Sequence, residues 1–236
     1  MFQPTPMLSS ILLSTFCLCA SACAAAFAAP LPSPVVETIE GRRVESLTIR
    51  HPAAKEVVVF EGGSRNTIDK WGTVLGQLGS EASVFAYNRP GYGDSEPATT
   101  PRDGRTIVEE LRRVLRHKGL QPPYVLVGHS LGGLYMQLFA RAYPDEVKGL
   151  VLVDALYPRM VRKASEFPFM TRLAGQLAFS RSVWREIEQI DATGEMILAL
   201  PAIDDKPIVR LVNQPTSNTA IAVDFGAFRM DETTRS

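Results

Sequence analysis

The chain has few of the residues that build disulfides and metal sites. Only three cysteines and three histidines occur among its 236 residues, and all the cysteines lie at or before Cys23. A mature domain that begins near Ala29 would contain no thiol, so it could form no disulfide and no cysteine metal site. Nothing in the sequence indicates a metal, a nucleotide or a flavin, and we expect no cofactor.

An excess of charge of either sign is also absent. Lysine plus arginine number 25, and aspartate plus glutamate also number 25. The chain therefore lacks the electrostatic field that would favour nucleic acid or an anionic membrane surface. We expect no nucleic-acid partner and a small, weakly charged molecule as substrate.

The N-terminal segment lacks charge altogether. The first charged residue is Glu37, and residues 7–29 are almost entirely apolar or small. This pattern predicts a signal peptide over residues 1–28, with cleavage after Ala28, and a periplasmic or secreted protein. Because no Lys or Arg precedes the apolar run, two alternatives stay open: a retained N-terminal anchor, since about 20 apolar residues can span a bilayer, or a lipoprotein modified at Cys23. Only these alternatives would place the protein on a membrane.

Residues 29–36 contain three prolines and predict a short, stiff spacer. Residues 37–236 are then expected to form one domain, because 45% hydrophobic content suits a single sizeable core. Strand-like runs alternate with helical patterns along it, at 44–49, 56–60, 83–87, 125–127, 149–153 and 207–212. This alternation predicts an α/β fold, with a mostly parallel sheet, flanking helices and functional residues at the carboxyl ends of the strands.

Residues 128–132, Gly-His-Ser-Leu-Gly, lie between one of these strands and a helical pattern that stops at Pro144. In a Gly-x-Ser-x-Gly turn at such a junction, the serine occupies a turn so sharp that its neighbours must lack side chains. Its hydroxyl is left exposed at the carboxyl end of the strand. Ser130 is therefore the candidate nucleophile.

Two motifs together resemble the alpha/beta-hydrolase superfamily. One is the strand, turn and helix around Ser130, and the other is Asn-Arg-Pro-Gly-Tyr-Gly-Asp-Ser at residues 88–95, which is similar to a signature that follows the fourth strand in these hydrolases. The resemblance implies an alpha/beta-hydrolase fold in which residues 155–205 form a helical cap insertion. Apolar and aromatic side chains of that insertion favour a lipophilic ester as substrate, with packing of the cap against itself as the alternative. Arg89 and Asp94 are expected to have a structural role.

The loop after residues 56–60 contains Gly62-Gly63-Ser64 where the family carries its oxyanion hole. Stabilisation of an oxyanion needs backbone N–H groups aimed at the developing charge, and glycines let the backbone come close. We assign the two donors to Ser64 and Leu131. Gly63 replaces Ser64 if the register differs by one residue.

The resemblance breaks down at the catalytic base. A serine hydrolase of this class needs a histidine later in the chain than the nucleophile and the carboxylate, but the three histidines are His51, His117 and His129. We expect the first two in surface positions, and the third to be directed away from Ser130. The resemblance covers the first to the seventh strand, so the fold is expected to be incomplete at the C-terminus. A truncated chain, a pseudoenzyme and an enzyme with an unusual base are the three explanations.

For the acid we choose Asp154, which directly follows the strand at 149–153. Many relatives place it after the seventh strand, where this chain has no carboxylate, and a turn or helix cap is the alternative role of Asp154. The sequence thus predicts an exported serine hydrolase that cleaves carboxylic esters through an acyl-enzyme on Ser130. The alternative is a catalytically inactive binding protein with the same fold.

Overall fold

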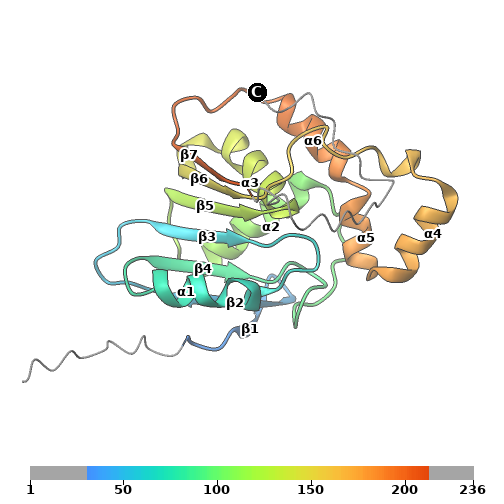
Figure 1. The fold of residues 1–236 in the computed structure, drawn as a ribbon. Helices are drawn as coiled ribbons and strands as arrows, with labels where there is room; N and C mark the ends of the chain where they lie inside the picture. The colour runs from blue at the N-terminus through green and yellow to red at the C-terminus, as the bar shows by residue number, and fades with distance from the viewer. Residues whose placement is uncertain (1–30, 213–236) are drawn as a thin grey trace, which may run out of the picture.

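The computed structural model describes residues 31–212, which form a sheet flanked by helices on both faces (Figure 1). The strand order in this part of the chain is β1-β2-β4-β3-β5-β6-β7. The strands are β1 (Val35–Ile39), β2 (Arg42–Ile49), β3 (Val57–Glu61), β4 (Ser83–Tyr87), β5 (Tyr124–His129), β6 (Val147–Val153) and β7 (Ile208–Leu211). β2 pairs antiparallel with β1 and β4, and all other pairs are parallel. This arrangement confirms the predicted α/β fold with a mostly parallel sheet.

The helices cover the sheet in two layers. They are η1 (Ile68–Trp71), α1 (Gly72–Leu78), α2 (Gly104–His117), α3 (Leu131–Ala142), η2 (Pro144–Glu146), η3 (Ala164–Glu166), α4 (Phe169–Ala178), α5 (Arg181–Ile187) and α6 (Ile190–Leu198). Leu75 of α1 packs on one face of the sheet, and the apolar sides of α2, α3 and α6 pack on the other. The central strands are buried by both layers, which explains their continuous apolar sequences.

The N-terminal hairpin was not predicted. Val35 and Val36, which the sequence analysis placed in the proline-rich spacer, belong to β1. Both side chains are exposed, at 54% and 40%, and only Ile39 at the end of the strand is buried, so these five residues show no clear alternation of apolar and polar positions. The hairpin turns through Glu40 and Gly41, which have φ angles of 49° and 78°. Two consecutive positive φ angles are typical of the tight turns that join antiparallel strands.

The segment between β6 and β7 contains α4, α5 and α6 (Figure 1). α4 and α5 extend beyond the carboxyl ends of the parallel strands, whereas α6 packs against α2 and α3. Only the first two of these helices are therefore in the position expected of a cap. No helix in residues 31–212 is long and apolar enough to cross a membrane. The predicted signal peptide, its cleavage site and Cys23 lie outside the described residues.

Glycines let the backbone of α3 come into direct contact with the backbone at the ends of β3 and β5. A Cβ atom at Gly132 would lie 2.3 Å from the carbonyl oxygen of Glu61, and one at Gly128 would lie 2.6 Å from the Cα of Gly133. These neighbours are main-chain atoms, which cannot move aside as the end of a flexible side chain can. A side chain at either position would push the first turn of α3 off the sheet.

We predict that Gly132→Ala lowers the free energy of unfolding by about 2 kcal/mol or more, because the added methyl overlaps backbone oxygens. The control is Gly76→Ala in α1, where no atom lies within 4 Å of the new Cβ. This control should be neutral or stabilising by up to roughly 1 kcal/mol, since alanine is the better helix former. Chemical denaturation measures both variants, and equal effects would contradict the packing described.

Candidate active site

Ser130 has a strained backbone that its surroundings hold in place. Its φ and ψ angles are 51° and −120°, a conformation that residues with a side chain rarely adopt. Its N–H donates to the Val153 carbonyl at 3.1 Å, and its carbonyl accepts from the N–H groups of Gly133 and Leu156, both at 3.0 Å. Three hydrogen bonds, to β6, to the loop that follows β6 and to the first turn of α3, thus fix the turn, as expected where backbone strain serves a function.

The predicted oxyanion loop lies directly against this serine. A Cβ atom at Gly63 would lie 3.0 Å from the Cβ of Ser130, so only glycine permits the contact. Leu131 is the first residue of α3, where N–H groups have no acceptor within the helix and the helix dipole is positive. Within residues 31–212, the N–H groups of Gly63, Ser64 and Leu131 donate to no acceptor. The structure therefore brings free donors next to Ser130, and the choice between Ser64 and Gly63 stays a prediction.

Asp154 lies at the same edge of the sheet. Val153 pairs with His129, so the residues that follow them, Asp154 and Ser130, are neighbours across β6 and β5. The Asp154 backbone has a φ angle of 45°, and its N–H donates to the Leu211 carbonyl at 2.7 Å. The side chain is exposed, and its carboxylate has no partner among the described residues. Its role as the acid stays a prediction.

Two of the three histidines lie near the opposite ends of the strands from Ser130. His51 donates its backbone N–H to the Ser83 hydroxyl at 3.0 Å, and Ser83 is level with Tyr124 because Val57 pairs with both. Tyr124 precedes Ser130 by six residues, which is about 20 Å along a strand. His117 ends α2 on the same side, where Arg50 donates to the neighbouring Lys118 carbonyl at 2.5 Å. Neither imidazole can take a proton from Ser130.

His51 also differs from its predicted environment. It lies in a loop, as expected, but it is half-buried rather than fully solvated, because Nδ1 is enclosed and has no hydrogen-bond partner among the described residues. The residue follows the end of β2, and the hydroxyl of Ser83 binds its backbone groups. His117, by contrast, is exposed as expected.

His129 is next to Ser130 in the chain, but its imidazole contacts other residues. Its Nδ1 lies 2.9 Å from Nδ2 of Asn66, and its ring stands edge-on to Trp71 with 6.4 Å between the ring centres. Sequence reasoning missed Asn66, because nothing local signals a contact between residues 63 positions apart. These contacts hold the imidazole on the loop and on η1.

Arg89 has the structural role that its motif predicts, but sequence reasoning did not identify its partners. The guanidinium is 2% exposed and lies against the predicted oxyanion loop. Nη1 donates to the Gly62 carbonyl at 2.6 Å, and Nη2 donates to the Gly63 carbonyl at 3.0 Å. Its carboxylate partners are Glu61, at 2.5 Å from Nη1, and Glu186 of α5, at 3.1 Å from Nε. The motif at 88–95 drew attention to this arginine, but not to these acceptors.

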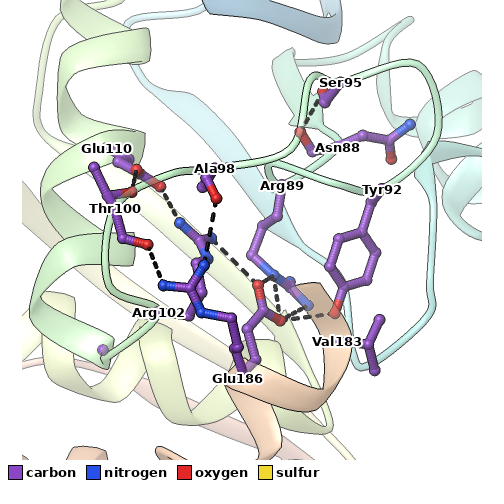
Figure 2. A network of polar contacts seen from close by, with 12 residues as sticks. Asn88, Arg89, Tyr92, Ser95, Ala98, Thr100, Arg102, Glu110, Val183 and Glu186 are labelled. Carbon is purple, nitrogen blue, oxygen red and sulfur yellow. Dashed lines mark hydrogen bonds and ion pairs between the residues drawn. The ribbon is translucent and has the colours of Figure 1, made fainter. Parts of the chain in front are cut away.

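A buried cluster of charges extends from Arg89. Figure 2 shows Glu186 between the guanidinium groups of Arg89 and Arg102, and Arg102 in turn donates to Glu110 at 2.6 Å. Tyr92 donates its hydroxyl to Glu186 at 2.7 Å, and burial raises the pKa of this tyrosine to about 12, so it remains a donor at neutral pH. Burial raises the pKa of the Glu61 carboxyl, while the Arg89 guanidinium acts in the opposite direction.

The site contains no arrangement that would hold a metal. Among the residues that the structure describes, no group of three or more His, Cys, Asp and Glu side chains could bind an ion. The chemistry available at Ser130 is that of a hydroxyl next to free backbone donors.

A strained serine between a buried strand and a helix, at the carboxyl ends of the strands of a mostly parallel sheet, has the geometry of a nucleophile elbow. The chain belongs to the alpha/beta hydrolase fold family, whose model matches residues 56–187. This match confirms the resemblance of the two sequence motifs.

Individual relatives share shorter segments. The uncharacterized protein YbdG of Bacillus subtilis (strain 168) is 28% identical over 126 residues, which are 52% of this chain and 38% of YbdG. A soluble epoxide hydrolase of Corynebacterium sp. (strain C12) is 31% identical over 104 residues, 44% of this chain and 36% of the relative. The chain thus spans less than two fifths of the length of either protein. The crystal structure of an alpha/beta hydrolase fold protein from Burkholderia ambifaria superposes with a TM-score of 0.59 at 16% identity, over 75% of this chain and 78% of that one.

We predict that Ser130→Gly is more stable than Ser130→Ala by about 1 kcal/mol or more. Both variants lose the hydroxyl, but only glycine relieves a strain of roughly 1–3 kcal/mol. The roughly 0.4–1 kcal/mol that glycine costs through the entropy of the unfolded chain offsets only part of this gain. Thermal and chemical unfolding of the two variants test the prediction, and an alanine variant of equal or greater stability would show that the turn is unstrained.

Proposed function

We propose that the protein is a serine hydrolase that cleaves carboxylic esters through an acyl-enzyme on Ser130. The observation that carries the proposal is the contact between Ser130 and a loop whose backbone donors are free. The Ser130 hydroxyl attacks the ester carbonyl, and the resulting oxyanion accepts hydrogen bonds from Leu131 and from Ser64 or Gly63. The alcohol leaves with a proton, and water then hydrolyses the acyl group from the serine.

The nature of the nucleophile separates ester hydrolysis from epoxide hydrolysis, the activity named for one relative. A serine oxygen that opens an epoxide would form an ether, which water does not cleave, and the enzyme would be inactivated after one turnover. The same oxygen forms an ester with an acyl group, and that intermediate can be hydrolysed. Serine at position 130 therefore favours acyl transfer.

A second function is favoured by the position of the histidines. Because His51 and His117 lie at the far edge of the sheet and His129 contacts Asn66, none of them is placed to take the Ser130 proton. In this alternative, the chain binds a ligand of the same class without turnover. Loss of the base costs a serine protease about a millionfold in turnover, so the two functions differ greatly in rate.

We propose that the substrate is a small lipophilic ester. We also propose that the chain is exported from the cytoplasm. The first rests on the neutral overall charge and on the apolar residues of α4 and α5, and the second on the uncharged segment 1–28. Membrane attachment through that segment or through Cys23 is the alternative destination.

The test is hydrolysis of p-nitrophenyl acetate by the parent chain and by Ser130→Ala, each with and without free imidazole. We expect slow hydrolysis that depends on Ser130, and an increase of up to roughly 100-fold in the Ser130-dependent rate when imidazole supplies the base. Mass spectrometry should find an acetyl group on the peptide that contains Ser130.

The Ser130→Ala variant controls for hydrolysis by imidazole itself. Equal rates for parent and variant under both conditions, with no acetylated peptide, would exclude the acyl-enzyme. Saturable ester binding that persists in Ser130→Ala would then support the binding protein.

A further inference from the structure

The Arg89 guanidinium forms hydrogen bonds through all three of its nitrogens. Nε contacts both carboxylate oxygens of Glu186 at 3.1 Å, and Nη2 approaches one of them at 3.0 Å. The remaining donors of Nη1 and Nη2 reach Glu61 and the carbonyls of Gly62 and Gly63. A carboxylate thus holds the guanidinium on either side. Between the two carboxylates, its planar Nη1 and Nη2 groups donate to two adjacent backbone carbonyls.

These two carbonyls determine where the following N–H groups point. In a planar trans peptide, the C=O and the next N–H point in opposite directions. Because the Gly62 and Gly63 carbonyls face Arg89, the N–H groups of Gly63 and Ser64 face away from it. Ser64 is the oxyanion donor assigned to this loop and Gly63 is its alternative, and Gly63 contacts Ser130.

We propose that Arg89 is a positioning residue for the oxyanion loop. Glu61 and Glu186 of α5 hold its guanidinium, and the guanidinium fixes the Gly62 and Gly63 carbonyls. The N–H groups of Gly63 and Ser64 then face the oxyanion formed at Ser130. This inference rests on the proposed acyl-enzyme function. It adds that the donors are set in place before substrate arrives, so no reorganisation is needed during the reaction.

The charge also strengthens the donors. A carbonyl that accepts from a cation polarises its peptide group, and the N–H of that group becomes a better donor. Glu61 and Glu186 supply the carboxylate partners that a buried guanidinium requires. Lysine cannot replace it, because a single ammonium cannot match the fork that binds two carbonyls and two carboxylates.

Because Glu186 lies on α5, the position of the Arg89 guanidinium depends on the cap helices. Its helix, α5, is also held by Arg185, which donates to the Thr100 carbonyl at 2.9 Å. The loop at 88–95 admits α5 at close range, since a Cβ atom at Gly91 would lie 2.0 Å from the Ser182 hydroxyl oxygen. The docked α5 is therefore part of the support for the oxyanion loop.

The test compares Arg89→Lys with Arg102→Lys. Both arginines are buried in the same cluster and both bind Glu186, but only Arg89 contacts the loop carbonyls. In the imidazole-supported assay, we expect Arg89→Lys to lower the maximal rate of Ser130 acylation by roughly 100-fold with little change in KM. Arg102→Lys should stay within about threefold of the parent, a difference smaller than the loss of one oxyanion donor.

A second measurement is independent of activity. We expect the nitrogen-15 order parameters of the Gly63 and Ser64 amides to be near 0.85 in the parent and in Arg102→Lys, and to fall below about 0.6 in Arg89→Lys. Equal order parameters in the two variants would overturn the positioning role even if ester hydrolysis is found. If Ser130→Ala matches the parent in hydrolysis, the proposed function fails, and the order parameters still decide the role of Arg89.

Glu186→Gln provides a variant that keeps the shape of the cluster. The amide oxygen can still accept from Nε, but the NH2 group cannot accept from the donors that the second carboxylate oxygen binds, so the guanidinium is held less firmly. We expect the same changes in order parameter and acylation rate as for Arg89→Lys, at smaller amplitude. A folded Glu186→Gln protein with the acylation rate and order parameters of the parent would show that the cap does not support the loop.

Discussion

Three backbone segments meet at Ser130 without side chains between them, and the rest of the molecule is arranged around this contact. The end of β3, the turn after β5 and the first turn of α3 approach at distances that exclude a Cβ atom at Gly63, Gly128 and Gly132. Main-chain N–H groups can therefore gather around one hydroxyl. The sheet aligns the ends of β3, β5 and β6, and the strained serine is held by a hydrogen bond that it donates to Val153 and one that it accepts from Leu156.

The parts of this arrangement that are encoded locally could be predicted from the sequence. The central strands are apolar runs, and the turn at Ser130 has glycines where side chains would collide, so the fold and the candidate nucleophile follow from short stretches of chain. The β1 strand could not be found in this way, because its valines face solvent and its sequence resembles a linker.

The partners of the site residues depend on contacts between distant positions. Arg89 and Glu186 are 97 residues apart, and Asn66 and His129 are 63 apart. No periodicity or spacing in one sequence connects such residues, since the pairing is decided by the way the sheet brings its loops together. A buried arginine also looks like a surface residue in composition, and only the acceptors around it reveal its environment.

The separation between Arg89 and Glu186 has a consequence for folding. Closing a loop of this length costs conformational entropy before any contact compensates for it, so contacts between distant residues tend to form late. The strands and the turn at Ser130 can assemble from nearer segments, but the guanidinium has no complete set of acceptors until α5 is synthesised and docked. During synthesis, the emerging chain would therefore form the turn at Ser130 well before the loop opposite that turn becomes rigid.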